Sequence, residues 1–155
     1  LIGYQSQFLT QTRGTGVLNR IFDSYAPHKG AIEGRRNGAL ISTDSGVVVA
    51  YALFNLQDRG QMFVTPQTPV YQGMIVGEHN RDNDLEINVL KGKQLTNVRS
   101  SGTDEAVKLV PPRVMSLERS EEHTYEDELL EVTPQNLRLR KMHLCPHERK
   151  RAARA

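Results

Sequence analysis

The chain has 155 residues, of which 37% are hydrophobic and 25% charged, a composition typical of a folded globular protein rather than a disordered one. No apolar run approaches the roughly 18–20 residues that a membrane-spanning helix needs, so we expect no membrane association. The formal net charge is +2, and the single cysteine, Cys145, excludes an internal disulfide and indicates a cytoplasmic protein.

The charges are unevenly distributed toward the carboxyl end. Residues 118–131 contain seven acidic residues and one basic residue, whereas residues 138–154 contain seven basic residues and one acidic residue. Segregated charge of this kind predicts an oriented contact with a polyanion, with the acidic segment facing away. The alternative is two solvated faces that partly neutralise each other.

The first residues in chain order predict the end of a small α+β unit. Apolar residues at three-to-four spacing indicate a helix over residues 1–13, and Gly14-Thr15-Gly16 ends it. A strand is then expected over residues 17–25. The break at Pro27-His28-Lys29-Gly30 predicts a boundary, which divides the chain into residues 1–27 and 28–155.

The second domain is expected to be strand-dominated, with short helices. Strands are predicted over residues 39–42, 46–54, 61–64, 70–77 and 85–90, with one helical turn in 55–60. The apolar run Val47–Ala50 predicts that the second of these strands is buried on both faces.

The carboxyl part of this domain continues the same alternation of short elements. Residues 109–115 should be extended, Ser116 should cap a short helix, and residues 129–132 and 137–139 should form a hairpin. In that hairpin Leu137 and Leu139 should face the core, and Arg138 and Arg140 the solvent. A short basic helix is expected after Pro146. The predicted fold class is therefore α+β, with a mostly antiparallel sheet.

Residues 88–108 are the most unusual stretch of the sequence. This segment is basic, broken by Gly92 and Gly102, and rich in hydroxyl and amide side chains, and loops of such length in a compact domain are usually functional. Because it has no aromatic residue, we expect it to recognise the backbone and shape of structured RNA rather than stacked bases. The candidate RNA-binding residues are Lys91, Lys93, Asn97, Arg99, Ser101 and Thr103 in this loop, and His79, Arg81, Arg138, Arg140 and Lys141 outside it.

The sequence contains no recognisable catalytic constellation. Gly92-Lys93 is followed by Gln94, so this chain has no P-loop. His79, Asp82 and Asp84 could form the metal site of a nuclease, but a tight polar turn explains the same residues. We therefore expect no catalytic residue, no metal and no cofactor in this chain.

Several longer phrases are more specific than these patterns. GRRNGALIS, AYALFNLQDRGQMFV, VYQGMIVGEHNRDNDLEINV, KGKQLTNVRSSGTDEAV and LLEVTPQNLRLRK together resemble the carboxyl-terminal region of the BipA/TypA family. These proteins are bacterial ribosome-associated translational GTPases related to elongation factor G. The resemblance covers almost the whole chain, with residues 1–27 similar to the end of the elongation-factor domain V, which is ferredoxin-like.

The resemblance implies a function for the chain. The full-length protein would hydrolyse GTP to GDP with Mg²⁺ in an upstream domain, and would act in ribosome assembly and the stress response. This part would bind the ribosomal A site, large-subunit rRNA and the acceptor end of an A-site tRNA as a monomer, through the loop 88–105. The segment LERSEEHT is more polar than the family pattern, so a looser or shorter helix is expected there.

A protein-interaction module that scaffolds assembly is the alternative function. Because counterion release would then be minor, its binding to ribosomes should depend little on salt.

Overall fold

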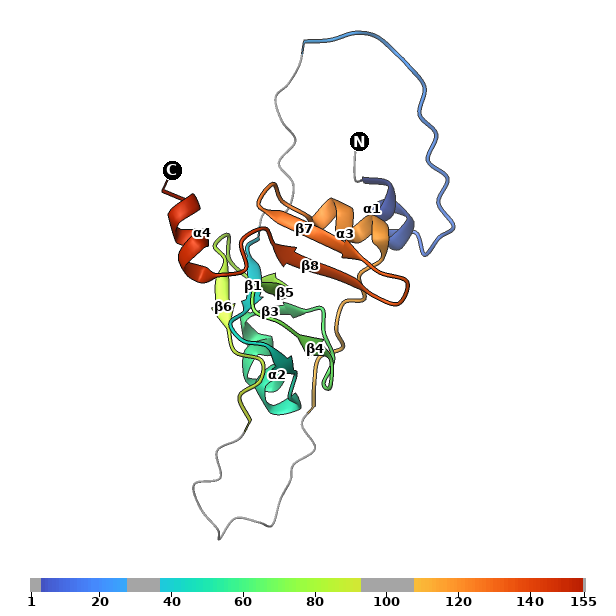
Figure 1. Cartoon of the computed structure of the whole chain (residues 1–155). Coiled ribbons are helices and arrows are strands. Elements are labelled where there is room, and N and C mark those ends of the chain that lie inside the picture. Colours follow the sequence, from blue (N-terminus) through green and yellow to red (C-terminus); the bar gives the residue numbers. More distant parts are fainter. Residues whose placement is uncertain (1–3, 28–36, 93–107, 155) are drawn as a thin grey trace.

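The computed structural model describes residues 4–27, 37–92 and 108–154, and shows strands flanked by short helices (Figure 1). Its strands are β1 (Ala39–Ser42), β2 (Gly46–Val47), β3 (Gly60–Met62), β4 (Pro69–Val70), β5 (Met74–His79), β6 (Leu85–Ile87), β7 (Glu128–Val132) and β8 (Leu137–Lys141). The helices are α1 (Tyr4–Gln11), α2 (Ala50–Leu56), α3 (Leu117–His123) and α4 (Pro146–Ala152), with a 3₁₀ turn at Gln57–Arg59. The expected α+β class with a mostly antiparallel sheet is confirmed.

Strand β5 is the centre of the main sheet, whose order is β6-β1-β5-β8-β7. One edge of β5 pairs with β1, whereas the other edge pairs with β8 at Met74 and Ile75 and with β3 from Gly77 to His79. These pairings are antiparallel, as is β7–β8, and only β1 and β6 run parallel among the described strands. A separate two-residue ribbon joins β2 and β4.

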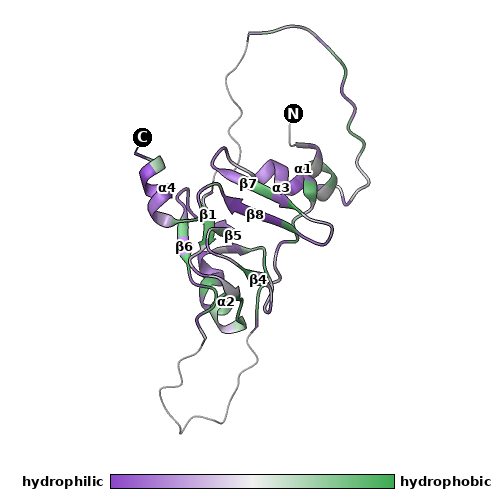
Figure 2. Cartoon of the chain, in the orientation of Figure 1, coloured by the Kyte–Doolittle hydropathy of each residue, from purple (hydrophilic) through white to green (hydrophobic). Residues whose placement is uncertain are grey.

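Alternation along β1 and β5 divides the core between the two faces of the sheet. Leu40 and Val76 belong to one apolar cluster, which also includes Leu53 of α2. Ile41 and Ile75, their neighbours in sequence, belong to the other cluster. Side chains of successive strand residues point to opposite faces, so both faces of the central strands are covered. Figure 2 shows the hydrophobic residues gathered in β1, β6 and α2, whereas α4 and β8 are largely hydrophilic.

The predicted strand over residues 46–54 is wrong. Only Gly46 and Val47 of this stretch form a strand, both are exposed, and Ala50–Leu56 forms helix α2. Ala52, Leu53 and Leu56 turn toward the core, while Tyr51 and Phe54 are about 40% exposed, which is the periodicity of a helix. Alanine and leucine are strong helix formers, and a short apolar run does not distinguish a buried helix from a strand.

The predicted strand over residues 17–25 is also absent. These residues have no regular structure, and Ile21 and Tyr25 are more than 90% exposed. Among the described residues no strand pairs with this segment, and an extended chain makes no ladder hydrogen bonds without a partner. The preceding helix ends as expected, because Gly14 adopts a φ of 78° and its N–H donates to the Leu9 carbonyl at 2.7 Å.

The elements after residue 108 follow the sequence closely. Residues 108–115 form neither helix nor strand, and the Ser116 hydroxyl accepts a hydrogen bond from the Arg119 N–H at 3.3 Å, which caps α3. The polar segment LERSEEHT does form a helix: Ser120 is buried, and the His123 ring packs edge-on against Phe63 at 5.2 Å. The β7–β8 hairpin also forms as predicted, with Leu139 buried.

Gly38 holds the start of β1 against the turn at residues 80–84. Its N–H donates to the Arg81 carbonyl at 2.7 Å, and its carbonyl accepts from the His79 N–H at 2.8 Å. A Cβ atom at this position would overlap the Asn83 carbonyl. We expect Gly38→Ala to lower the free energy of unfolding by about 1–3 kcal/mol, measured by urea denaturation. Gly92→Ala is the control, because the space around Gly92 is open, and an equal loss in both variants would contradict this account.

Candidate nucleic-acid interface

Both ends of the long loop leave the domain at helix α2 and the turn that follows it. Before the loop, the Val89 carbonyl accepts from the Val49 N–H at 3.1 Å, and the Asn88 side chain donates to Asp44 at 2.7 Å. After the loop, the Val110 N–H donates to the Gln57 side chain at 3.1 Å. The ends are therefore attached to one small region of the fold.

Lys91 is the loop candidate that the structure describes, and it is exposed. It lines a hollow of about 400 Å³ together with Tyr51 and Asn55 of α2. Sequence reasoning missed these two neighbours because it divided α2 between a strand ending at residue 54 and a separate helical turn, whereas the helical spacing of AYALFNL could have shown them on one face. The other loop candidates, Lys93, Asn97, Arg99, Ser101 and Thr103, lie outside the described residues.

Two further candidate RNA-binding residues, Arg81 and His79, lie at the turn after β5 and differ in exposure. Arg81 is exposed at the tip of this turn. His79 is only 6% exposed, and its Nδ1 lies 2.6 Å from the Asn83 carbonyl, so its ring holds the turn together. The buried His79 ring therefore offers RNA little surface, whereas the Arg81 side chain is accessible, and RNA binding by either residue stays a prediction.

Lys141 is also not on the surface, although the sequence placed it among exposed basic residues. Its side chain is 2% exposed, and its ammonium nitrogen lies 2.6 Å from Asp84, 2.9 Å from Asp127 and 2.9 Å from Glu128. Glu128 is itself fully buried and is the cross-strand partner of Lys141 in the hairpin. This ammonium therefore ties the β5–β6 turn to the hairpin instead of meeting phosphate.

The carboxylates determine the charge state of Lys141. Burial alone lowers the pKa of this ammonium, but hydrogen bonds to Asp127, Asp84 and Glu128 outweigh burial and hold its pKa above the ordinary 10.5. A raised pKa in the folded state adds stability below pH 10.5, and this stability is lost as pH rises through the folded pKa. We expect the free energy of unfolding to fall above pH 10.5, and the fall to be smaller in Lys141→Met, as measured by urea denaturation at increasing pH.

Arg138 and Arg140 lie on the same face of β8, with Leu139 between them in sequence, but they have different surroundings. Arg140 pairs with Glu131 at 3.3 Å, and the same carboxylate accepts from the Tyr71 hydroxyl at 2.7 Å. Burial, followed by this hydrogen bond, raises the pKa of Tyr71 well above its usual value. Arg138 is half-buried at the rim of a second hollow. Arg138 thus remains a candidate contact, whereas Arg140 is already bound to an acid.

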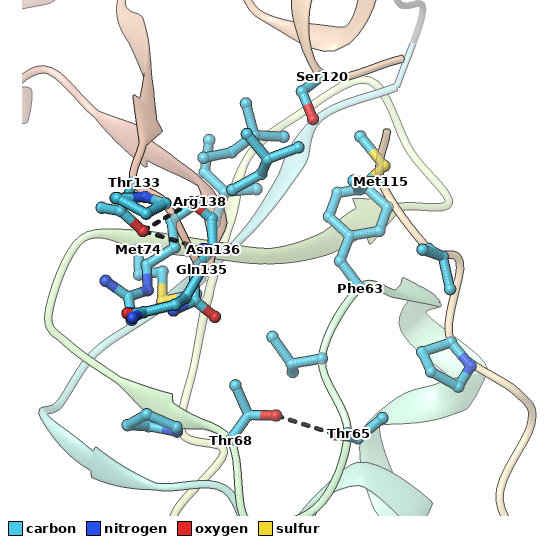
Figure 3. Close-up of a pocket in the computed structure, with 18 residues that line it drawn as sticks. Phe63, Thr65, Thr68, Met74, Met115, Ser120, Thr133, Gln135, Asn136 and Arg138 are labelled. Atoms are coloured by element: carbon cyan, nitrogen blue, oxygen red, sulfur yellow. Dashed lines mark hydrogen bonds between the residues drawn. The ribbon is translucent and has the colours of Figure 1, made fainter. Parts of the chain in front are cut away.

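The second hollow lies under the hairpin and has a volume of about 530 Å³ (Figure 3). The hairpin turn closes one side through hydrogen bonds between Thr133 and Asn136, and Phe63 and Met115 line the other side. Its walls carry the Arg138 guanidinium but no acid, so the hollow offers no acid–base pair for catalysis.

The alternative nuclease site has a structural explanation. The Asp84 carboxylate accepts from the Ala39 N–H at 2.7 Å and pairs with Lys141, while His79 is bound to the turn. Within residues 4–27, 37–92 and 108–154, no group of three potential ligands is arranged to hold a metal ion. These residues therefore act together as a polar turn.

The fold and the exposed basic positions define an α+β module with a mostly antiparallel sheet and accessible basic side chains at Arg81 and Lys91. Residues 37–146 match the family model of the TypA/BipA C-terminal domain. The chain belongs to this family.

Curated relatives extend the similarity to nearly the whole chain. The chain is 53% identical over 155 residues to the large ribosomal subunit assembly factor BipA of Bacillus subtilis, and 53% identical over 156 residues to that of Escherichia coli K12. The protein of the same name from Synechocystis is 49% identical over 142 residues, or 92% of the chain. The chain spans about a quarter of the length of these relatives: 25%, 26% and 24%, respectively. In the described part of the chain, no helix is long and apolar enough to cross a membrane.

Proposed function

We propose that the chain is the module through which a BipA-type assembly factor contacts RNA of the large ribosomal subunit. The observation that carries this proposal is the 53% identity, over the whole chain, to proteins named large ribosomal subunit assembly factors. Family membership supports a ribosomal partner for the chain, and the basic loop supports contact with RNA.

The described residues at the two ends of the loop support binding to RNA. The described residues before position 93 and after position 107 both bond beside α2, so the two ends of this segment share one anchored base. Exposed Lys91 stands at that base and supplies a positive charge for phosphate. Tyr51 in the same hollow offers a half-exposed ring, on which a base can stack.

The finer features of the proposal come from the family. The full-length protein hydrolyses GTP with Mg²⁺ in a separate domain, works in the cytoplasm as a monomer, and acts in ribosome assembly and the stress response. The loop reaches the acceptor end of an A-site tRNA and neighbouring large-subunit rRNA. Lys91, Lys93, Asn97, Arg99, Ser101 and Thr103 contact RNA there, and Arg81 and Arg138 contribute from the domain surface.

A salt series separates RNA binding from protein scaffolding. We expect the affinity of the 155-residue chain for purified large ribosomal subunits to fall with salt, with a logarithmic slope of about −3 or steeper, because at least three cations replace counterions on phosphate. Sedimentation at increasing potassium chloride concentration measures this slope. A slope near zero would favour the scaffold, and no binding at the lowest salt concentration would also contradict the proposal.

A further inference from the structure

Arg149 ties helix α4 to the sheet. The Arg149 guanidinium donates to Glu86 of β6 at 2.9 Å and to the carbonyls of His143 and Leu144 at 2.9 and 2.7 Å. The Arg149 side chain is only 14% exposed, so it points into the body of the domain. Cys145 precedes the helix, and Pro146 starts it at the first turn, where proline is favoured. These contacts fix which side of the short helix faces outward.

The outward side is almost entirely basic. At about 100° per residue, His147, Lys150, Arg151 and Arg154 fall within an arc of about 100°, nearly opposite Arg149. All four are exposed. Arg154 lies just beyond α4, and its N–H donates to the Arg151 carbonyl at 3.1 Å, which continues the turn. The one acidic residue of the helix, Glu148, lies about 60° outside this arc.

We infer that this basic face of α4 (His147, Lys150, Arg151 and Arg154) is a second contact with the RNA phosphate backbone. The inference rests on the proposed function and adds a contact surface to it. Three guanidinium or ammonium groups on one side of a helix can each pair with a phosphate and release a counterion. Arg149 holds helix α4 in place, so these side chains lose fewer degrees of freedom when they bind phosphate.

A membrane surface fits this face less well than RNA does. Helices that lie on a membrane bury large apolar side chains on the side opposite their charges. Between Pro146 and Arg154 the non-polar residues are one proline and two alanines, and the side opposite the basic face is occupied by Arg149. Charge without an apolar face is the pattern of a phosphate-backbone contact.

The basic face is separate from the foot of the long loop. Lys91 shares its hollow with α2. In Figure 1, α4 and α2 lie at opposite ends of the domain, with β1 and β6 between them. Changes at the two places should therefore act independently and add in their effect on binding.

The test compares variants of the 155-residue chain in sedimentation with purified large ribosomal subunits over a salt series. Lys150→Gln with Arg151→Gln should weaken binding about tenfold and reduce the salt slope by about 2, because two phosphate contacts are lost. Arg13→Gln with Arg20→Gln is the matched control, since it removes two exposed arginines from the amino-terminal segment. All four side chains are exposed, so the urea midpoints should be unchanged.

The outcomes distinguish this inference from the proposed function. If the wild-type chain binds with a steep salt slope but the α4 variant behaves like the control, the second contact is overturned and the function stands. The second contact is also overturned if the variant loses helicity but keeps its affinity, because the basic residues then only stabilise the helix end. Binding of the wild-type chain to phosphatidylserine vesicles, lost in the α4 variant while subunit binding is kept, would show that the face meets membrane instead.

Discussion

Replacement of Lys141 by methionine is expected to lower the free energy of unfolding by about 3–5 kcal/mol, because it leaves the buried carboxylate of Glu128 without its cation. The side chain of Glu128 is 0% exposed and that of Lys141 is 2% exposed. Methionine keeps the volume of the side chain but removes the charge that Asp84, Asp127 and Glu128 share. The loss should also free the β5–β6 turn from the hairpin.

Urea denaturation at neutral pH measures this loss, and Arg138→Met is the matched control. Arg138 lies on the same strand, on the opposite face from Lys141, and is only half-buried. Its replacement should change stability by no more than about 1 kcal/mol, as is usual for partly exposed charges. An equal loss in the two variants would show that the buried cluster adds nothing beyond an ordinary surface charge.

The β7–β8 hairpin shows which buried side chains the sequence pattern predicted and which one it did not. Alternation placed Leu137 and Leu139 toward the core, and the same period of two places Lys141 on that side. The structure follows the period, with Leu139 and Lys141 both buried. Lys141 was a predicted RNA contact because basic residues at strand ends and on exposed strand faces suit phosphate. Lysine is rarely buried unless it is paired, and here carboxylates surround the ammonium. The acidic residues Asp127 and Glu128, directly across the hairpin, were the available signal.

Local capping signals were reliable, whereas short apolar runs were not. Ser116 and Gly14 mark helix ends in the structure as they do in the sequence. The run from Val47 to Phe54 was misassigned because strands and buried helices of this length share the same composition. The parallel pairing of β1 with β6 depends on contacts between distant segments, which no local pattern encodes.

The structure departs more from the predicted set of RNA-binding residues than from the predicted fold. Burial removed His79 and Lys141 from the surface, and the pairing with Glu131 occupies Arg140. Arg81, Arg138 and Lys91 keep accessible surface. The remaining candidates thus lie at the loop, at the β5–β6 turn and on the hairpin.

The loop should supply the largest share of RNA affinity. Lys91, Lys93 and Arg99 carry three positive charges within nine residues of sequence. Changing all three to alanine removes three phosphate contacts, which should weaken binding on the order of a hundredfold and reduce the salt slope by about 3. Lys91 is exposed and packs little, so its loss should leave folding intact. The variant with Lys150→Gln and Arg151→Gln shows whether the loop exceeds α4 in its effect.

Co-sedimentation of full-length protein with ribosomes, held in the GTP-bound state, tests whether the loop is the RNA contact. We expect the variant with Lys91, Lys93 and Arg99 changed to alanine to stay in the supernatant at a salt concentration where the wild-type protein pellets with ribosomes. The Arg13→Gln and Arg20→Gln variant should pellet like the wild-type protein. If the loop variant pellets as fully as the wild-type protein across the salt series, the loop is not the RNA contact and the central claim is wrong.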